Sequence, residues 1–386
     1  MKHFLFLLAL NFIFMGLAKA EYPLSAPRSV RVAILKDTEN FVLSIRGRFQ
    51  IVDSRSFEVL DQPRSLTDAQ VTADPNGITI GKNKYAACQI TILPRRDGNV
   101  FVNKRRFRGD INLTRGTNNR MLVVNSIGLE EYVKGVLYHE VSHRWPLEAL
   151  KAQAVAARTY ALYRMQQTAA LDYDVTNDIY SQVYGGRSSE RYRCSVAVDR
   201  TKGQVLIYGA KILPAYFHAT CGGTTEDASE LWKENLHPLK GVVCDYCRLS
   251  PHYRWKRNFR SSDVQDKLSE QGINVGVIED IGVVDSNRSG RIKTLQITSR
   301  DGQKTLIPGK DFRTILGPNV VKSNSYEVVM QGYYFDLLGK GWGHGVGLCQ
   351  WGANFMARAH YRYEQILGYY YPGAAIVNYR EVIGGL

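Results

Sequence analysis

The sequence predicts an α+β fold in which a helical core, built on a two-helix motif, packs on β-rich segments. Apolar residues recur every three or four positions between residues 129 and 165, a pattern typical of amphipathic helices. Short alternating or β-branched runs fill residues 28–124 and recur within residues 253–335. We therefore expect one β region before the helices and a mainly β insertion before the Gly-rich stretch at residues 339–347.

The chain has 386 residues, more than one ordinary hydrophobic core holds, so we expect several structural units. Composition changes along the chain suggest their limits. The units are a signal peptide at 1–20, a β-rich N-terminal region at 21–125, the first part of the core at 126–252, a mainly β insertion or subdomain at 253–335, and the C-terminal part of the core, with the Gly-rich loop and a helix, at 336–386. Nothing in residues 253–335 suggests chemistry.

Residues 1–20 have the composition of a secretory signal. Lys2 precedes an apolar run over residues 4–17, and Ala-Lys-Ala at 18–20 offers a small-residue cleavage site. The apolar run is short for a membrane span, and no later segment has about eighteen uninterrupted apolar residues. We expect an exported protein of the periplasm or cell wall with no stable membrane span after signal cleavage; an uncleaved anchor is the alternative.

The charge balance is strongly basic. Lys and Arg number 50 against 36 Asp and Glu, giving a formal net charge of +14. Such a surface suits an anionic polymer. Nucleic acid is the usual partner for this balance, but export favours wall polymers or anionic lipid surfaces, and no motif suggests base readout. We therefore expect no nucleic-acid partner.

Glu140 occupies an unusual position in the first predicted helix. It follows Val133, Val136 and Leu137 by seven, four and three residues, so its carboxylate shares their apolar face. Placing a charge there is costly. Either the carboxylate is paired, with Arg158 or a backbone donor, or it is a general acid whose pKa is raised by burial.

The remaining features of the helical pair have simpler interpretations. Glu130 and Glu131 lie in the first turn, where we expect solvated acids that favour the helix dipole. Trp145 and Pro146 join the two helices, and Pro146 suits the first turn of the second helix because its missing N–H costs nothing there.

Four sequence blocks carry a family resemblance. They are EEYVKGVLYHEVSHRWPLEALKAQAVAARTYAL, NDIYSQVYGG at 177–186, AYFHATCGGTTEDASELW at 215–232 and GKGWGHGVGLCQWGANFMA at 339–357. In this order they resemble the sporulation stage II protein D and amidase-enhancer family of peptidoglycan lytic transglycosylases. The resemblance spans roughly residues 100–375 and implies that Glu140 is the catalytic residue.

The resemblance also implies where substrate binds. A loop formed by the last block would pack against the catalytic helix and place polar and aromatic side chains near the cleft. The expected substrate-binding residues are Gln182, His218, His344, Gln350 and Trp351. Gln182 offers an amide for sugar hydroxyl or acetamido groups, although turn chemistry is the ordinary use of such a residue. His218 is alternatively a structural histidine.

The chain has six cysteines, and four of them fall in a suggestive pattern. Cys244 and Cys247 form a C-x2-C knuckle of the kind that holds zinc. Cys221 and Cys349 lie in two blocks that the resemblance places close together. At both positions the sequence motif of the family usually has Ser. We therefore expect one structural zinc bound by these four residues, with His218 as a substitute ligand.

The alternative use of these four cysteines is disulfide bonding, since an exported protein with an even cysteine count first suggests disulfides. The two remaining cysteines, Cys88 and Cys194, are expected to be small buried apolar residues or a bridge to each other.

The resemblance and the predicted burial of Glu140 together favour a lytic transglycosylase. It would cleave the bond between N-acetylmuramic acid and N-acetylglucosamine in peptidoglycan glycan strands, with formation of 1,6-anhydro-muramic acid and with no cofactor needed for the chemistry. One alternative is a non-catalytic wall-binding enhancer of a partner amidase. Another is a hydrolytic lysozyme, with Glu148, Glu226 or Asp227 as its second carboxylate.

Overall fold

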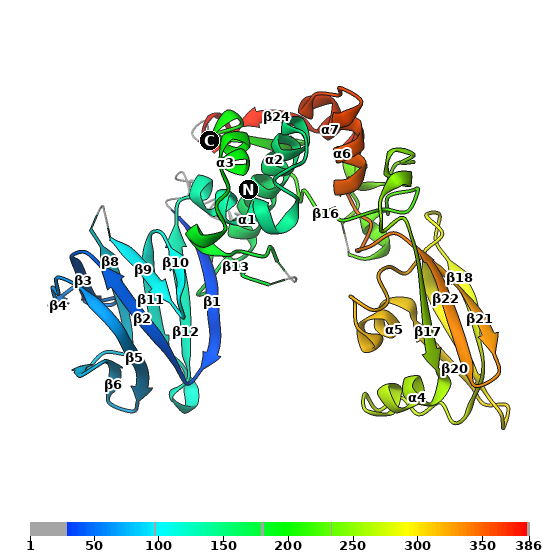
Figure 1. Cartoon of the computed structure of the whole chain (residues 1–386), viewed down its shortest axis with the longest axis horizontal. Helices are drawn as coiled ribbons and strands as arrows, with labels where there is room; N and C mark the ends of the chain where they lie inside the picture. Colours follow the sequence, from blue (N-terminus) through cyan, green and yellow to red (C-terminus); the bar gives the residue numbers. More distant parts are fainter. Residues whose placement is uncertain (1–28, 96–97, 179–180, 233, 384–386) are drawn as a thin grey trace, which may run out of the picture.

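The computed structural model describes residues 29–383 except 96–97, 179–180 and 233, so the expected signal peptide lies outside the described residues. Figure 1 shows a helical body with β sheets on two sides, the N-terminal sheets on one and the sheets of residues 254–340 on the other. The predicted α+β class is confirmed. None of the described helices combines the length and hydrophobicity needed to cross a membrane.

Two mainly antiparallel sheets form the N-terminal region, and their strands alternate buried and more exposed residues because one face of each packs in the core. The first sheet contains, in spatial order, β13 (Val175–Thr176), β1 (Val30–Thr38), β12 (Met121–Ile127), β11 (Asp110–Arg115), β8 (Gln89–Pro94), β3 (Phe49–Asp53) and β4 (Val59–Asp61). The second contains β10 (Arg105–Phe107), β9 (Asn99–Val102), β2 (Asn40–Arg46), β5 (Leu66–Asp74), β6 (Gly77–Ile80) and β7 (Asn83–Tyr85).

The helical body is organised around the predicted helix pair. These helices are α1 (Leu129–Glu140) and α2 (Leu147–Gln167), with Pro146 as the N-cap residue of α2. Alanines recur along α2 and most of its residues are buried, as expected for a helix that is apolar nearly all round and packed on several sides. The body is completed by α3 (Tyr192–Arg200), α6 (Gln350–Arg358), α7 (Tyr363–Tyr370), α8 (Tyr379–Ile383), a sheet of β15 (Lys211–Ile212), β14 (Gln204–Tyr208) and β24 (Ala375–Asn378), and the parallel pair β16 (Phe217–His218) and β23 (Leu348–Cys349).

A buried ion pair joins the two central helices. Arg158 of α2 is 0% exposed and Glu130 of α1 is 12% exposed, and their side chains meet at 2.7 Å. The Arg158 guanidinium also donates to the carbonyls of Val198 and Gln204, and Glu130 accepts from the Gly203 N–H. The prediction that Glu130 is a solvated acid is therefore wrong, because the tertiary fold covers the first turn of α1.

Residues 254–340 form a β-rich subdomain with its own hydrophobic cluster. One sheet contains β17 (Arg254–Arg260), β22 (Tyr334–Lys340) and β21 (Tyr326–Gln331), and the other contains β18 (Ile278–Ser286), β19 (Ile292–Ser299) and β20 (Lys304–Pro308). Its helices are α4 (Ser261–Ser269) and α5 (Gly309–Leu316). The chain enters the subdomain at β17 and leaves it at β22, so two covalent connections join it to the helical body. They lie side by side, because Arg254 pairs with Lys340 and the Gly341 N–H donates to the Tyr253 carbonyl.

We expect Glu130→Ala to lower the free energy of unfolding by about 3 to 5 kcal/mol, because it leaves the Arg158 charge buried without its carboxylate. Urea denaturation at neutral pH measures the change. Glu131→Ala is the matched control, since Glu131 is exposed in the same turn and should change stability by less than about 0.5 kcal/mol. Equal losses in the two variants would contradict the structural role of Glu130.

Candidate functional site around Glu140

Glu140 is the last residue of α1, where the apolar face of the helix turns toward the loop at residues 181–184. Val133, Val136 and Leu137 on that face are fully buried, which places the Glu140 carboxyl against the protein interior. Val183 donates its backbone N–H to Oε1 at 3.3 Å, and the Gln350 amide donates to Oε2 at 3.5 Å. Within the described residues Glu140 has no ion pair, because Arg158 is taken up by Glu130.

This environment changes the protonation of Glu140. The residue keeps partial solvent exposure, but its carboxyl group is surrounded by protein atoms. Burial raises the pKa of Glu140 from 4.5 to about 7, although the hydrogen bonds from Val183 and Gln350 oppose the rise. A pKa near neutral pH suits a group that first donates a proton and then takes one back.

Gln182 and Gln350 contact this site in different ways. Gln182 is buried and its side chain accepts from the Tyr132 hydroxyl at 2.9 Å and donates to the Ala157 carbonyl at 3.3 Å. It thus anchors the loop that presents the Val183 N–H, with its amide directed to α1 and α2. Gln350 begins α6 and directs its amide to Glu140 itself.

Trp351 lies next to Gln350 in an aromatic cluster. Its ring centroid is 5.1 Å from that of Trp145 and 6.3 Å from that of His252. Trp145 belongs to the turn between α1 and α2, so this contact packs the start of α6 against the end of the helix that carries Glu140. The cluster holds Gln350 in reach of the carboxyl group.

The two candidate histidines lie together, on β16 and the Gly-rich stretch. Their ring centroids are 5.6 Å apart, and both contact the backbone of Val346: His344 Nδ1 accepts from its N–H, and His218 Nδ1 donates to its carbonyl. Burial lowers the pKa of His344 to about 4 and lowers the pKa of His218 well below its usual value. Both rings are neutral at pH 7, which excludes them as cations there.

A row of aromatic rings that the sequence interpretation did not single out connects these residues. Tyr160 of α2 lies 5.9 Å from Tyr216, Tyr216 stacks on Trp232 at 4.3 Å, and Trp232 lies 5.3 Å from His344. Burial raises the pKa of Tyr160, and the nearby charge of Glu140 adds to the rise. Trp232 is 37% exposed, so the row offers accessible ring faces. Aromatic residues in sequence do not reveal whether they pack or stack on sugars, which is why they were missed.

Four cysteines form a compact cluster inside the protein. The sulfurs of Cys221, Cys244, Cys247 and Cys349 all lie within 4.8 Å of one another, and all four residues are buried. All six cysteines are free, and the Cys221 and Cys247 sulfurs are 3.4 Å apart, far beyond a disulfide bond of about 2.05 Å. The disulfide alternative therefore has no support here. His218 lies outside the group of ligand atoms.

The thiols of the cluster shift one another's pKa in opposite directions: the pKa values of Cys244 and Cys247 are lowered, and those of Cys221 and Cys349 are raised. Hydrogen bonds from the other three thiols hold the pKa of Cys247 well below its usual range. The Cys349 sulfur also accepts from the backbone N–H groups of Cys221 and Gly352. A set of four thiolates is a typical tetrahedral ligand set for zinc. Of the remaining cysteines, Cys194 is fully buried, as expected of a small apolar residue, and Cys88 is only half-buried.

The three acids considered as second carboxylates are all held by other groups. Glu148 pairs with Lys151 and accepts from the Tyr363 N–H. Asp227 caps a short turn at Ser229 and pairs with Lys240.

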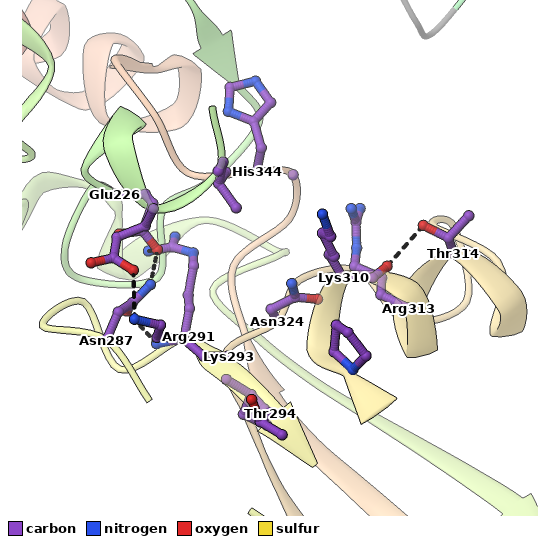
Figure 2. Close-up of a pocket in the computed structure, with 15 residues that line it drawn as sticks. Glu226, Asn287, Arg291, Lys293, Thr294, Lys310, Arg313, Thr314, Asn324 and His344 are labelled. Carbon is purple, nitrogen blue, oxygen red and sulfur yellow. Dashed lines mark hydrogen bonds and ion pairs between the residues drawn. The ribbon is translucent and has the colours of Figure 1, made fainter. Parts of the chain in front are cut away.

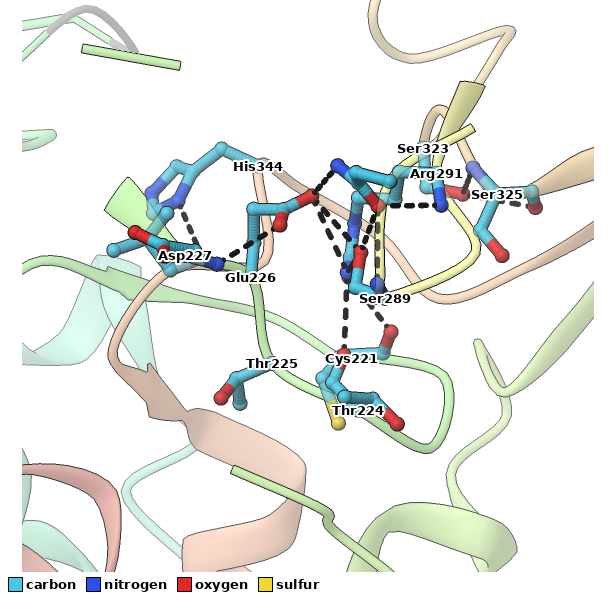
Figure 3. A network of polar contacts seen from close by, with 12 residues as sticks. Cys221, Thr224, Thr225, Glu226, Asp227, Ser289, Arg291, Ser323, Ser325 and His344 are labelled. Carbon is cyan, nitrogen blue, oxygen red and sulfur yellow. Dashed lines mark hydrogen bonds and ion pairs between the residues drawn. The ribbon is translucent and has the colours of Figure 1, made fainter. Parts of the chain in front are cut away.

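Glu226 is buried in the network of Figure 3, where Asn287 and Ser289 donate to it. Among the described residues, none of the three acids shares a hydrogen-bond partner with Glu140.

Two family models match different parts of the chain. A model described as stage II sporulation protein matches residues 117–208, which contain α1, α2 and the loop with Gln182. A domain of unknown function matches residues 244–347, which contain the cysteine knuckle, the β-rich subdomain and His344. The four-cysteine cluster takes residues from outside both matched ranges as well as from within the second.

Known proteins resemble the chain over most of its length. An uncharacterized protein of Brachyspira hyodysenteriae is 33% identical over 94% of this chain and 96% of its own. The amidase enhancer of Bacillus subtilis is 30% identical over 64% of this chain but 40% of its own. Stage II sporulation protein D of Bacillus subtilis is 32% identical over 66% of this chain and 75% of its own. The chain therefore belongs to the stage II sporulation protein D family.

Proposed function

We propose that this protein is a lytic transglycosylase that cleaves peptidoglycan glycan strands, with Glu140 as the only acid and base. The observation that carries the proposal is a buried carboxyl group with a pKa near 7 and no cationic partner among the described residues. Family membership supports a role at the cell wall. The basic charge of the chain suits an anionic wall polymer, and we propose that it acts in the periplasm or cell wall after export.

The chemistry needs one carboxyl group. Protonated Glu140 would donate its proton to the oxygen of the bond between N-acetylmuramic acid and N-acetylglucosamine, so that the C1–O bond breaks. The resulting carboxylate would take the proton from the C6 hydroxyl of the muramoyl residue, whose oxygen attacks C1 and closes the 1,6-anhydro ring. Because the substrate supplies its own nucleophile, a second carboxylate such as that of a lysozyme is unnecessary.

The neighbours of Glu140 would assist by holding its carboxyl group in place. The Val183 N–H and the Gln350 amide both donate to it, and both stabilise the charged form that exists between the two proton transfers. The aromatic row of Tyr160, Tyr216 and Trp232 supports the binding of sugar rings beside the acid. His344 extends this aromatic row beyond Trp232, and Trp351 belongs to a second aromatic cluster, with Trp145, beside Gln350.

We expect Glu140→Gln to lower the rate of anhydro-muropeptide release at least about 100-fold, because the amide keeps the shape of the side chain and cannot transfer the proton. Mass analysis of products from purified peptidoglycan measures the effect, and thermal unfolding checks that the variant is folded. Glu148→Gln is the control, since Glu148 is held by Lys151 and Tyr363 and should keep most activity. Full product yield from folded Glu140→Gln would refute the catalytic role.

The raised pKa of Glu140 predicts two pH effects. The rate of glycan cleavage should fall as the pH rises through about 7, because the acid loses its proton. Stability should fall in the same direction, since between pH 4.5 and about 7 the folded protein keeps a proton that the unfolded chain releases. Relative to Glu140→Gln, the wild type should lose up to roughly 3 kcal/mol of unfolding free energy across this interval.

Rate profiles and urea denaturation at several pH values test these effects. A cleavage rate that stays constant from about pH 6 to 8, or a wild type and Glu140→Gln with parallel stability profiles, would show that burial does not control the proton.

We further propose that the four-cysteine cluster binds one structural zinc ion. The donor set fits, because four buried thiols lie close enough to share one ion and the pKa of Cys247 is held low. The ion would take no part in the chemistry. It would tie the C-x2-C knuckle to Cys221 and Cys349 and so hold Gln350, the residue after Cys349, beside Glu140.

Protein purified without chelator should contain about one zinc per chain, and Cys244→Ser should lower both the zinc content and the melting temperature. Elemental analysis and thermal unfolding measure the two quantities. Cys88→Ser is the control, because Cys88 lies outside the cluster and its loss should leave zinc content unchanged. Metal-free protein, or equal zinc content in both variants, would rule out this site.

A second candidate function comes from the likeness to a protein named amidase enhancer. In that role the chain would bind the wall and stimulate a cell-wall amidase without cleaving glycan. The Glu140→Gln variant separates the two functions, because stimulation of an amidase does not need proton transfer. Stimulation by wild type and Glu140→Gln alike, with no anhydro products from either, would favour the enhancer.

A further inference from the structure

A pocket opens where the β-rich subdomain meets the helical body. Its volume is about 310 Å³, and Figure 2 shows Glu226 and Arg291 on one side and Lys310 and Arg313 on the other, with Asn324 between them. The body contributes His344 to the lining and the subdomain contributes β19, β20 and α5. The pocket is thus separate from the Glu140 carboxyl but shares His344 with the aromatic row.

The pocket lining carries more positive than negative charge. The cations are Arg291, Lys293, Lys310 and Arg313, and the carboxylates are Glu226 and Glu230. Both carboxylates are already occupied: Glu226 lies 3.9 Å from Arg291, and Glu230 lies 3.1 Å from Lys293. Within the described residues, Lys310 and Arg313 have no carboxylate partner. The surplus of two cations therefore belongs to the α5 side.

Two arginines of the pocket, Arg291 and Arg313, are in unfavourable environments: the Nε of one has no hydrogen-bond partner within the described residues, and the other lies near a like charge. Arg291 is only 3% exposed, and its Nε is buried without a hydrogen-bond partner. Burial lowers the pKa of Arg313, and the nearby charge of Arg291 lowers it further. An anion between Arg291 and Arg313 would relieve both effects.

Arg291 and Arg313 have structural roles as well, which separates them from Lys310. The Arg313 guanidinium donates to the carbonyls of Val321, Pro318 and Lys322. The Arg291 guanidinium donates to the carbonyls of Cys221 and Thr224, as Figure 3 shows, so it fastens the subdomain to the cysteine cluster.

Among the residues that the structure describes, the Lys310 side chain has no comparable structural role. It is exposed in the first turn of α5, where its charge interacts unfavourably with the helix dipole. The helix N-terminus and the ammonium group together attract an anion.

The aromatic row leads from the candidate acid to this pocket. It starts at Tyr160, near Glu140, and ends at His344, which lines the pocket. A glycan strand stacked along accessible faces of these rings would bring its side groups to the α5 cations. Sugar hydroxyl and acetamido groups are uncharged, so the group that matches the cations is a carboxylate.

We propose that this pocket, with Lys310 as its principal free cation, binds a carboxylate carried by the glycan strand whose cleavage is proposed above. The inference rests on the proposed function for the identity of the polymer. Such a carboxylate has two sources, the lactyl group of a peptide-free muramic acid and the α-carboxylates of a peptide stem. Both present the same chemistry to an ammonium and a guanidinium.

Binding of soluble glycan fragments to the full chain tests the pocket without depending on catalysis. Isothermal titration in a Glu140→Gln background uses three fragments: peptide-free with a lactyl carboxylate, peptide-bearing, and peptide-free with the carboxylate reduced to an alcohol. Lys310→Glu should weaken binding of one or both carboxylate-bearing fragments about tenfold and leave the reduced fragment unchanged. Whichever of the two fragments responds identifies the source.

Lys267→Glu is the matched control, because Lys267 is exposed on α4 of the same subdomain and does not line the pocket. It makes the same change in net charge. Unchanged binding in Lys310→Glu, equal weakening in Lys267→Glu, or equal weakening for the reduced fragment would each overturn the pocket assignment. Glycan cleavage by the wild type is measured separately, so failure of the proposed function and failure of the pocket are distinguished.

Discussion

Four thiols meeting inside the protein are the constraint on which the rest of the candidate site depends. Cys221, the 244–247 knuckle and Cys349 come from three distant segments, yet their sulfurs lie within 4.8 Å of one another. The residue after Cys349 donates to Glu140, and the Cys221 carbonyl accepts from Arg291. The same cluster therefore positions one partner of the candidate acid and one wall of the cationic pocket.

Two carboxylates on α1 show how position within the fold decides chemistry. Glu130 and Glu140 lie at opposite ends of the helix, and both are covered by other parts of the chain. Glu130 meets Arg158 and becomes one half of a structural ion pair. Glu140 meets only uncharged donors, so burial raises its pKa to about 7. A buried acid becomes a candidate for proton transfer where the fold places no cationic side chain beside it, because its pKa is then raised.

The β-rich subdomain contributes more than its sequence suggested. Residues 253–335 contain no recognisable catalytic or binding motif, and their sequence predicts strands with only a structural role. In the structure, β19, β20, α5 and the loops beside them form most of a pocket whose remaining wall belongs to the helical body. A site at the junction of two units has no signature in either segment, because its residues become neighbours only when the units meet.

The sequence by itself determined the α+β class, the helix pair and the apolar setting of Glu140, because residue spacing along a helix or strand sets which side chains share a face. It also singled out the four cysteines that lie together. Only the tertiary structure decided that Arg158 pairs with Glu130, that Gln182 faces α1 and α2, and that Lys310 lies opposite Arg291. These contacts join residues far apart in the chain, and periodicity carries no information about which distant face will cover another.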